Sequence, residues 1–271
     1  MTPTDAEPRI ARREAAGVSL RRLGDVACVH LDDGRGNALG SAMLSALGSA
    51  IAEASSASAV LLVGRPRIFS GGLDLREIAH LPRAALLGFL DLLHDTRRAL
   101  FALPRPLVVA VAGSAVGAGA ALLCCGDVRL GARDAGRVGF PEVKLGVPLP
   151  ASALEIAGSA LTPGAAAKAL LFGGSFPRDE ALAMGFFHEI VEPDRLVEAA
   201  EQAAIAAAGM SAALGQIKLA LRREALRRMD DDCAASHEAF ASAWTSPAAQ
   251  ARIDAVLDQL RPREPSVPAA P

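Results

Sequence analysis

Residues 106–127 read PLVVAVAGSAVGAGAALLCCGD. The run Leu107–Ala112 has the length and the β-branched composition of a strand buried on both faces of a parallel sheet. The next segment, Gly113–Leu123, is rich in glycine and alanine, which is typical of a tight turn that opens a closely packed helix. A buried strand followed by such a turn and helix predicts an α/β fold, because the helix covers sheet that water would otherwise reach.

Strands and helices alternate on both sides of this unit, up to about residue 140. The expected strands are Val18–Leu23 and Val26–Leu31, joined as a hairpin at Gly24-Asp25, then Ala59–Val63, Leu107–Ala112 and Asp127–Gly131. The expected helices are Ser41–Ala54 with Ser41 as its N-cap, a helical start at Asp74, and Ala84–Leu103, which Pro104 ends.

Beyond Ser152 the pattern becomes helical throughout. Apolar residues recur at helical spacing in 152–161, 163–171, 179–184, 195–208, 212–229 and 233–260. The last eleven residues contain four prolines, and we expect them to be disordered. The organisation predicted is a frayed N-terminus (1–17), a core (18–195), a C-terminal helical region (196–260) and a disordered tail (261–271).

Composition narrows the class of protein. The chain has 271 residues, of which 51% are hydrophobic, and a net charge of −2, so it can bury a large core and has no overall field to attract nucleic acid or an anionic membrane. Its four cysteines lack CxxC spacing, which predicts neither a disulfide framework nor a zinc site. No signal-peptide pattern or long apolar span is present, and we expect a soluble, cytoplasmic protein.

Two turns offer backbone amides for binding negative charge. In FSGGLDL, residues 69–75, the glycines permit a sharp turn and Asp74 can cap the next helix, which leaves the amide of Leu73 free. The second free amide lies near Ala118, at the start of a helix. A plain strand-to-helix connection explains the first turn equally well, and the second lacks the complete pattern of a dinucleotide or phosphate loop.

An acidic side chain, Glu142, follows Phe140-Pro141 among apolar neighbours. Burial would raise its pKa and suit it to act as a general base, whereas a solvated loop glutamate is the simpler alternative. The five histidines show no HExxH or comparable spacing, and we interpret His30 and His94 as structural residues with satisfied hydrogen bonds.

In this order and spacing, the segments resemble the crotonase superfamily, the enoyl-CoA hydratase/isomerase family. The resemblance runs from Val18 to Arg261. It rests on Gly36-Asn37-Ala38-Leu39, Phe69–Leu75, the block Pro106–Asp127 with its final Cys-Gly-Asp, and Phe140-Pro141-Glu142 with Leu145-Gly146 behind it. It implies a spiral of ββα units with a C-terminal helical region that builds trimers or dimers of trimers.

The resemblance also implies a ligand and site residues. A coenzyme A thioester would be the substrate, with no further cofactor and no metal. The backbone amides of Leu73 and Ala118 would form the oxyanion hole, and Glu142 would be the catalytic acid–base group. Substrate-binding positions would be Ala38 near the adenine and Leu73, Asp74, Leu75 and Arg76 along the acyl-CoA channel, with Val116, Ala121 and Phe140 near the acyl group.

One departure from the family pattern affects the predicted activity. Hydratases of the family carry a second glutamate in the helix after the glycine block, and here that position is Ala121. A methyl group can neither orient water nor transfer a proton. The resemblance therefore favours a double-bond isomerase with one carboxylate. An atypical hydratase, a decarboxylase and a non-catalytic acyl-CoA-binding protein remain alternatives.

Overall fold

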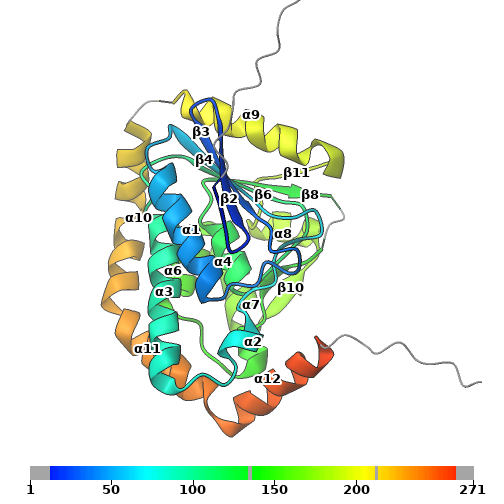
Figure 1. The fold of residues 1–271 in the computed structure, drawn as a ribbon, viewed down its shortest axis with the longest axis vertical. Coiled ribbons are helices and arrows are strands. Elements are labelled where there is room, and N and C mark those ends of the chain that lie inside the picture. The colour runs from blue at the N-terminus through cyan, green and yellow to red at the C-terminus, as the bar shows by residue number, and fades with distance from the viewer. Residues whose placement is uncertain (1–12, 134–135, 211–212, 261–271) are drawn as a thin grey trace, which may run out of the picture.

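The computed structural model describes residues 13–133, 136–210 and 213–260. Seven strands form a large sheet in the order β1-β2-β3-β4-β6-β8-β11 (Figure 1). The first three strands are antiparallel neighbours, and from β3 onward each pair is parallel. The strands are β1 (Arg13–Ala15), β2 (Val18–Leu23), β3 (Val26–Leu31), β4 (Ala59–Val63), β6 (Leu107–Val111), β8 (Val128–Ala132) and β11 (Glu189–Val191).

A second, smaller sheet has the order β10-β9-β7-β5. Its strands β5, β7 and β9 are mutually parallel, and β10 pairs with β9 in the antiparallel sense. Each strand has only three residues: β5 (Ile68–Ser70), β7 (Ser114–Val116), β9 (Val138–Phe140) and β10 (Gly174–Phe176).

Helices follow the strands and make up most of the C-terminal part. They are α1 (Ser41–Ala54), α2 (Leu75–Ile78), α3 (Arg83–Phe101), α4 (Ala118–Cys124), α5 (Glu142–Leu145), α6 (Ala151–Ala160), α7 (Pro163–Leu171), α8 (Arg178–Met184), α9 (Leu196–Ala208), α10 (Ala213–Asp231), α11 (Cys233–Trp244) and α12 (Pro247–Gln259). Pro193–Arg195 forms a 3-10 turn before α9.

The chain repeats one unit three times. The units β4-β5-α2, β6-β7-α4 and β8-β9-α5 each place their first strand in the large sheet, their second in the small sheet, and then a helix. This arrangement confirms the predicted α/β spiral of ββα units.

Both faces of the large sheet are buried along its central strands β3, β4 and β6. Val26, Cys28 and Leu61 face α9, whereas Val29 and Leu62 face the main core below α1, α3 and α4. Figure 1 shows α9 crossing the top of the sheet and α1 and α3 on the other side. Neighbouring residues of a strand point to opposite faces, so a sheet covered by helices on both faces requires strands that are apolar at nearly every position. The central strands of this sequence have that composition.

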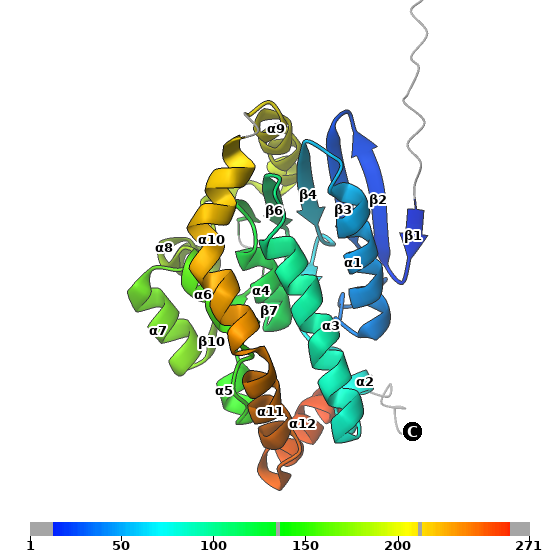
Figure 2. The ribbon, with the colours of Figure 1, turned by 90° about the vertical axis from the view of Figure 1, so that its left-hand side faces the viewer.

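The helix α10 packs against α6 and α11 packs against α3, and α12 turns back beneath α2 and α5 (Figure 2). Asp127, the last residue of the Cys-Gly-Asp motif, connects α10 to the core. Its carboxylate accepts from Lys218 at 2.6 Å, from Arg222 at 2.9 Å and from the amide of Leu107 at 2.7 Å. Arg222 also stacks over the ring of Phe101. The Cys-Gly-Asp motif thus has a structural role, because its aspartate attaches α10 to the core.

No single helix within the described ranges has the length and apolar character to cross a membrane. Pro193–Ala208 and Ala213–Asp231 meet those criteria only when taken as one pair, which is bent by 102°.

The prediction that Ser41 is an N-cap is wrong. Gly40 takes that position and offers no side chain, and Ser41 is the first helical residue. The carboxylate of Glu77 accepts from the Ser41 amide at 3.1 Å and from its hydroxyl. A distant acidic group on α2 therefore caps α1, which the local sequence pattern could not reveal.

Other boundaries also differ from expectation. The segment 233–260 is two helices, because Ser246 caps a new helix and Pro247 occupies its first turn. The helix expected at Ala84–Leu103 spans Arg83–Phe101. Strands β10 and β11 lie in the part expected to be purely helical, and Arg13–Ala15 pair with β2 rather than fraying. Residues 1–12 and the predicted disordered tail lie outside the described residues.

Candidate active site

Three predicted site residues follow three parallel strands of the small sheet. Leu73 comes three residues after β5, Ala118 two residues after β7, and Glu142 two residues after β9. Because the carboxyl ends of parallel strands meet at one edge of a sheet, the topology brings the three turns together. The small sheet thus determines where the candidate active site lies.

The turn that carries Leu73 is fixed by buried polar side chains. Ser70 donates to the carbonyl of Asn37 at 2.7 Å and accepts from the amide of Gly72 at 3.2 Å. The Asn37 side chain donates to the carbonyls of Leu31 (2.8 Å) and Phe69 (3.1 Å), and it is fully buried. The amide of Leu73 donates no hydrogen bond within the described ranges, so it is available to a ligand.

The amide of Ala118 is the first of α4, so it has no carbonyl partner within the helix. Gly117 before it has φ +56° and ψ −119°, a conformation that glycine tolerates and other residues do not. A Cβ placed on Gly72 would lie 3.7 Å from the Ala118 nitrogen and 2.9 Å from the carbonyl oxygen of Val116. The two turns are therefore in direct contact, with both free amides in the contact region.

Glu142 begins α5, and its carboxyl group lies against the second turn. A Cβ on Gly117 would come within 2.9 Å of Glu142 Oε1. The residue as a whole is half-buried, but Oε2 is enclosed and has no hydrogen-bond partner among the described residues. A buried acceptor without a partner costs free energy and is a common feature of functional sites.

Burial raises the pKa of Glu142 from 4.5 to about 7. The interaction with its own backbone amide and the positive charge of Arg97 act in the opposite direction and limit the rise. The simpler alternative, a solvated loop glutamate, is therefore excluded. A carboxyl group with a pKa near 7 can both accept and return a proton at neutral pH.

Arg97 on α3 is a site residue that the sequence analysis missed. It is 2% exposed, its Nε has no partner among the described residues, and the hydrogen bond that its Nη1 donates to Ser152 is long at 3.4 Å. Burial lowers its pKa to about 10, so the guanidinium remains charged at neutral pH. The sequence signal that could have identified Arg97 is its place as a cationic residue on the apolar face of the helix, between Leu93 and Leu100.

Ala121 is fully buried, and its amide donates to the carbonyl of Gly117 at 3.1 Å. Residues four apart lie on the same face of a helix, so its methyl group is one turn from the glycine that contacts Glu142. Among the charges of the described residues that perturb the pKa of Glu142, none is a second carboxylate. At the position where family hydratases have their additional glutamate, this chain has a small apolar surface.

The other predicted binding residues surround the first turn. Ala38 is half-buried, and its neighbour Leu39 forms a parallel bridge with Leu73. Asp74 caps α2 by accepting from the amide of Arg76, as the sequence predicted. The Arg76 side chain is exposed and donates to the carbonyl of Leu260 at 2.9 Å.

The spiral of ββα units with a C-terminal helical part defines the class: the protein has the crotonase fold. The structure of human mitochondrial delta3-delta2-enoyl-CoA isomerase superposes with a TM-score of 0.83 over 93% of this chain and 98% of that chain, at 24% identity. A Mycobacterium tuberculosis protein aligns at 35% identity and a TM-score of 0.76, covering 84% of this chain and 98% of its own. That protein is called an enoyl-CoA isomerase in one structure and a probable enoyl-CoA hydratase in another.

The enoyl-CoA hydratase/isomerase family model matches residues 22–262, and the chain belongs to that family. The 2,3-dehydroadipyl-CoA hydratase of Escherichia coli is 34% identical over 195 residues, which are 69% of this chain and 74% of that protein. The chain spans about half the length of several mycobacterial curated relatives that it matches.

Proposed function

We propose that this protein isomerises 3-enoyl-CoA to 2-enoyl-CoA, with Glu142 as the only proton carrier. The observation that carries the proposal is the carboxyl group of Glu142, whose enclosed Oε2 has no hydrogen-bond partner among the described residues and whose Oε1 lies against the turn before Ala118. The small side chain of Ala121 supports it, because hydration requires a further group to hold water.

In the proposed mechanism, the thioester oxygen accepts hydrogen bonds from the amides of Leu73 and Ala118. Glu142 takes a proton from C2, the negative charge moves onto the thioester oxygen as an enolate, and Glu142 returns the proton to C4. The double bond moves into conjugation with the carbonyl group, and no water is consumed. Each amide donor would supply about 3–4 kcal/mol of transition-state stabilisation.

A comparison of two substrates tests this proposal. The purified protein is mixed with a 3-enoyl-CoA, and the absorbance of the conjugated thioester is followed. It is then mixed with a 2-enoyl-CoA, whose hydration would remove the same absorbance. The proposal predicts a rise with the first substrate and little change with the second. Hydration as the faster reaction would overturn it, and binding without turnover would favour an acyl-CoA-binding protein.

The substitution Ala121→Glu examines the role of the missing acid. Because position 121 lies one turn from Gly117, a glutamate there would reach toward the carboxyl group of Glu142. We expect hydration of 2-enoyl-CoA to become measurable in this variant. An unchanged product ratio in a correctly folded variant would contradict the argument that Ala121 determines the reaction.

We also propose that the backbone at Ala38 and residues Leu73–Arg76 bind the coenzyme A part of the substrate, and that the protein forms trimers or dimers of trimers. Large apolar side chains on the described surface support self-association, among them Phe172 (76% exposed) and Leu221 (81% exposed). Sedimentation velocity of the full chain distinguishes trimer, hexamer and monomer.

A further inference from the structure

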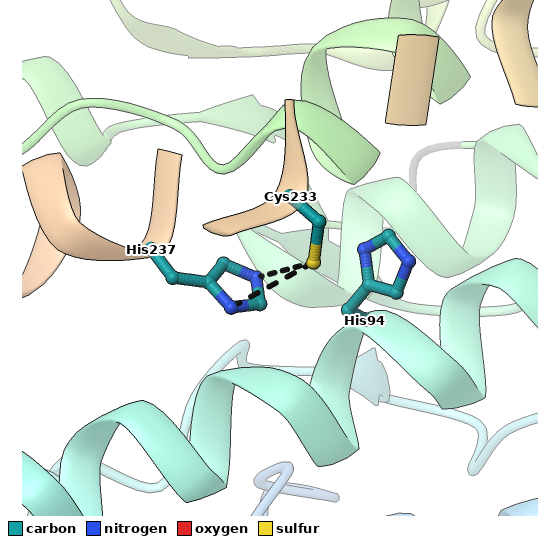
Figure 3. Close-up of side chains that lie close together, drawn as sticks. All are labelled: His94, Cys233 and His237. Atoms are coloured by element: carbon teal, nitrogen blue, oxygen red, sulfur yellow. Dashed lines mark hydrogen bonds between the residues drawn. The ribbon is translucent and has the colours of Figure 1, made fainter. Parts of the chain in front are cut away.

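Three side chains of types that can ligate a metal ion gather between α3 and α11, outside the candidate active site. His94 belongs to α3, and Cys233 and His237 belong to α11. One ligand atom from each lies within 4.8 Å of the others. Figure 3 shows the Cys233 sulfur between the two imidazole rings. The sulfur is 3.7 Å from Nε2 and 3.9 Å from Nδ1 of His237.

The structure leaves one nitrogen of this cluster unsatisfied. His94 is 6% exposed, and its Nδ1 has no hydrogen-bond partner among the described residues. In Figure 3 this nitrogen faces the sulfur of Cys233. The expectation that His94 is a satisfied structural histidine is therefore wrong. A buried imidazole nitrogen without a partner requires an explanation, and a bound cation supplies one.

Carboxylates contact the outer nitrogens of both rings. Asp91 Oδ1 lies 3.0 Å from His237 Nδ1, and Asp230 Oδ1 lies 3.6 Å from His94 Nε2. Arg98 holds Asp230 with two hydrogen bonds, at 2.6 and 2.8 Å. Carboxylates in this position keep a proton on the outer nitrogen and leave the inner nitrogen of each ring free to bind metal.

The dimensions suit tetrahedral zinc. With Zn–S near 2.3 Å and Zn–N near 2.0–2.1 Å, a nitrogen and a sulfur bound to one Zn²⁺ are about 3.6 Å apart. The distance from Cys233 Sγ to His237 Nε2 is 3.7 Å. Cys233 is only half-buried, and a water molecule would be the fourth ligand. Two imidazoles and a thiolate form a donor set that Zn²⁺ prefers to Mg²⁺ or Ca²⁺.

We propose that His94, Cys233 and His237 bind one Zn²⁺ ion, which links the C-terminal helix α11 to α3. The site requires no part of the candidate active site. Its expected role is structural, since its ligands connect two helices of the described chain that are distant in sequence.

Titration of the metal-free full-length protein with Zn²⁺ tests the proposal, using calorimetry at neutral pH. We expect one equivalent to bind, the melting temperature to rise, and Cys233→Ser to bind at least about 100-fold more weakly. His80→Ala is the matched control, because His80 is an exposed histidine outside the cluster that pairs with Asp254 on α12. This variant should bind Zn²⁺ as the wild type does.

Substitution with Co²⁺ gives a second readout that does not depend on stability. A thiolate ligand produces a sulfur-to-cobalt charge-transfer band, which should appear in the wild type and in His80→Ala and be absent in Cys233→Ser. Failure to bind a stoichiometric ion would overturn the proposal. So would binding that Cys233→Ser leaves unchanged, or a cobalt complex without the charge-transfer band.

Discussion

Replacing Glu142 with glutamine should slow catalysis and stabilise the fold at the same time. The native pKa of Glu142 is about 7, against 4.5 for an ordinary glutamate, because burial disfavours the ionised form. The native state therefore holds the proton more tightly than the unfolded state does. The contribution of the protonated group to stability is complete below about pH 4.5 and is lost as the pH rises through about 7.

The magnitude follows from the difference between the two pKa values. At about 1.4 kcal/mol per pH unit, ionisation of Glu142 costs the fold about 3 kcal/mol by pH 8. Glutamine keeps nearly the same volume and has no charge to bury. The free energy of unfolding of Glu142→Gln should thus exceed that of the wild type by about 3 kcal/mol at pH 8 and by little at pH 5.

Two measurements test this prediction. Urea unfolding at a fixed protein concentration from pH 5 to pH 8 gives the stability difference, and turnover of 3-enoyl-CoA should fall by about 10²–10⁴-fold because glutamine accepts no proton. Glu189→Gln, at an exposed strand position, is the control and should change neither quantity appreciably. A stability difference that does not vary with pH would refute the burial argument, and near-normal turnover would refute the role as base.

Three further substitutions test other parts of the site and fold. Arg97→Met removes a positive charge that lowers the pKa of Glu142, so the midpoint of the pH dependence of kcat/KM should move upward from about 7. An unchanged midpoint would show that Arg97 does not influence the titration of Glu142. Gly117→Ala introduces a Cβ into both a glycine-only conformation and the space of the Glu142 carboxyl group, and kcat/KM should fall by about 100-fold. Asp127→Asn leaves two cations of α10 without a counter-charge, so thermal or urea unfolding should show a loss of about 3 kcal/mol; a loss below about 0.5 kcal/mol would contradict the anchoring role.

Much of the fold follows from local sequence patterns, and the rest depends on contacts between distant segments. The apolar strands β3, β4 and β6 are recognisable because each is long and nearly continuous in apolar residues. The small sheet escapes such reasoning, since strands of three residues are too short to show a period. Yet the small sheet is what brings the three turns of the candidate site together.

In the candidate site too, some features follow from local sequence patterns and others depend on contacts between distant segments. The sequence predicts the free amides of Leu73 and Ala118, because glycines and helix starts are local signals. It leaves two interpretations of Glu142 open, and only the contact with Gly117 and the enclosed Oε2 decide between them. The position of Arg97 near that carboxyl group depends on how α3 packs, which no local pattern encodes.

The histidine–cysteine cluster could be predicted only in part. Cys233 and His237 lie four residues apart on one helix, a spacing that places two ligands on the same face. The third ligand, His94, belongs to a helix far earlier in the chain, so motif spacing alone gave no reason to group it with them. Cys28, Cys124 and Cys125 are buried, and Cys233 differs from them in being half-buried.

The fate of a labelled proton tests the central claim most directly. A 3-enoyl-CoA carrying deuterium on C2 is converted in ordinary water, and the product is examined by NMR or mass spectrometry. If the enclosed Glu142 carboxyl group carries the proton, part of the deuterium taken from C2 appears at C4 of a 2-enoyl-CoA. A 3-hydroxyacyl-CoA as the main product, or turnover that the Glu142→Gln variant retains, would contradict the account.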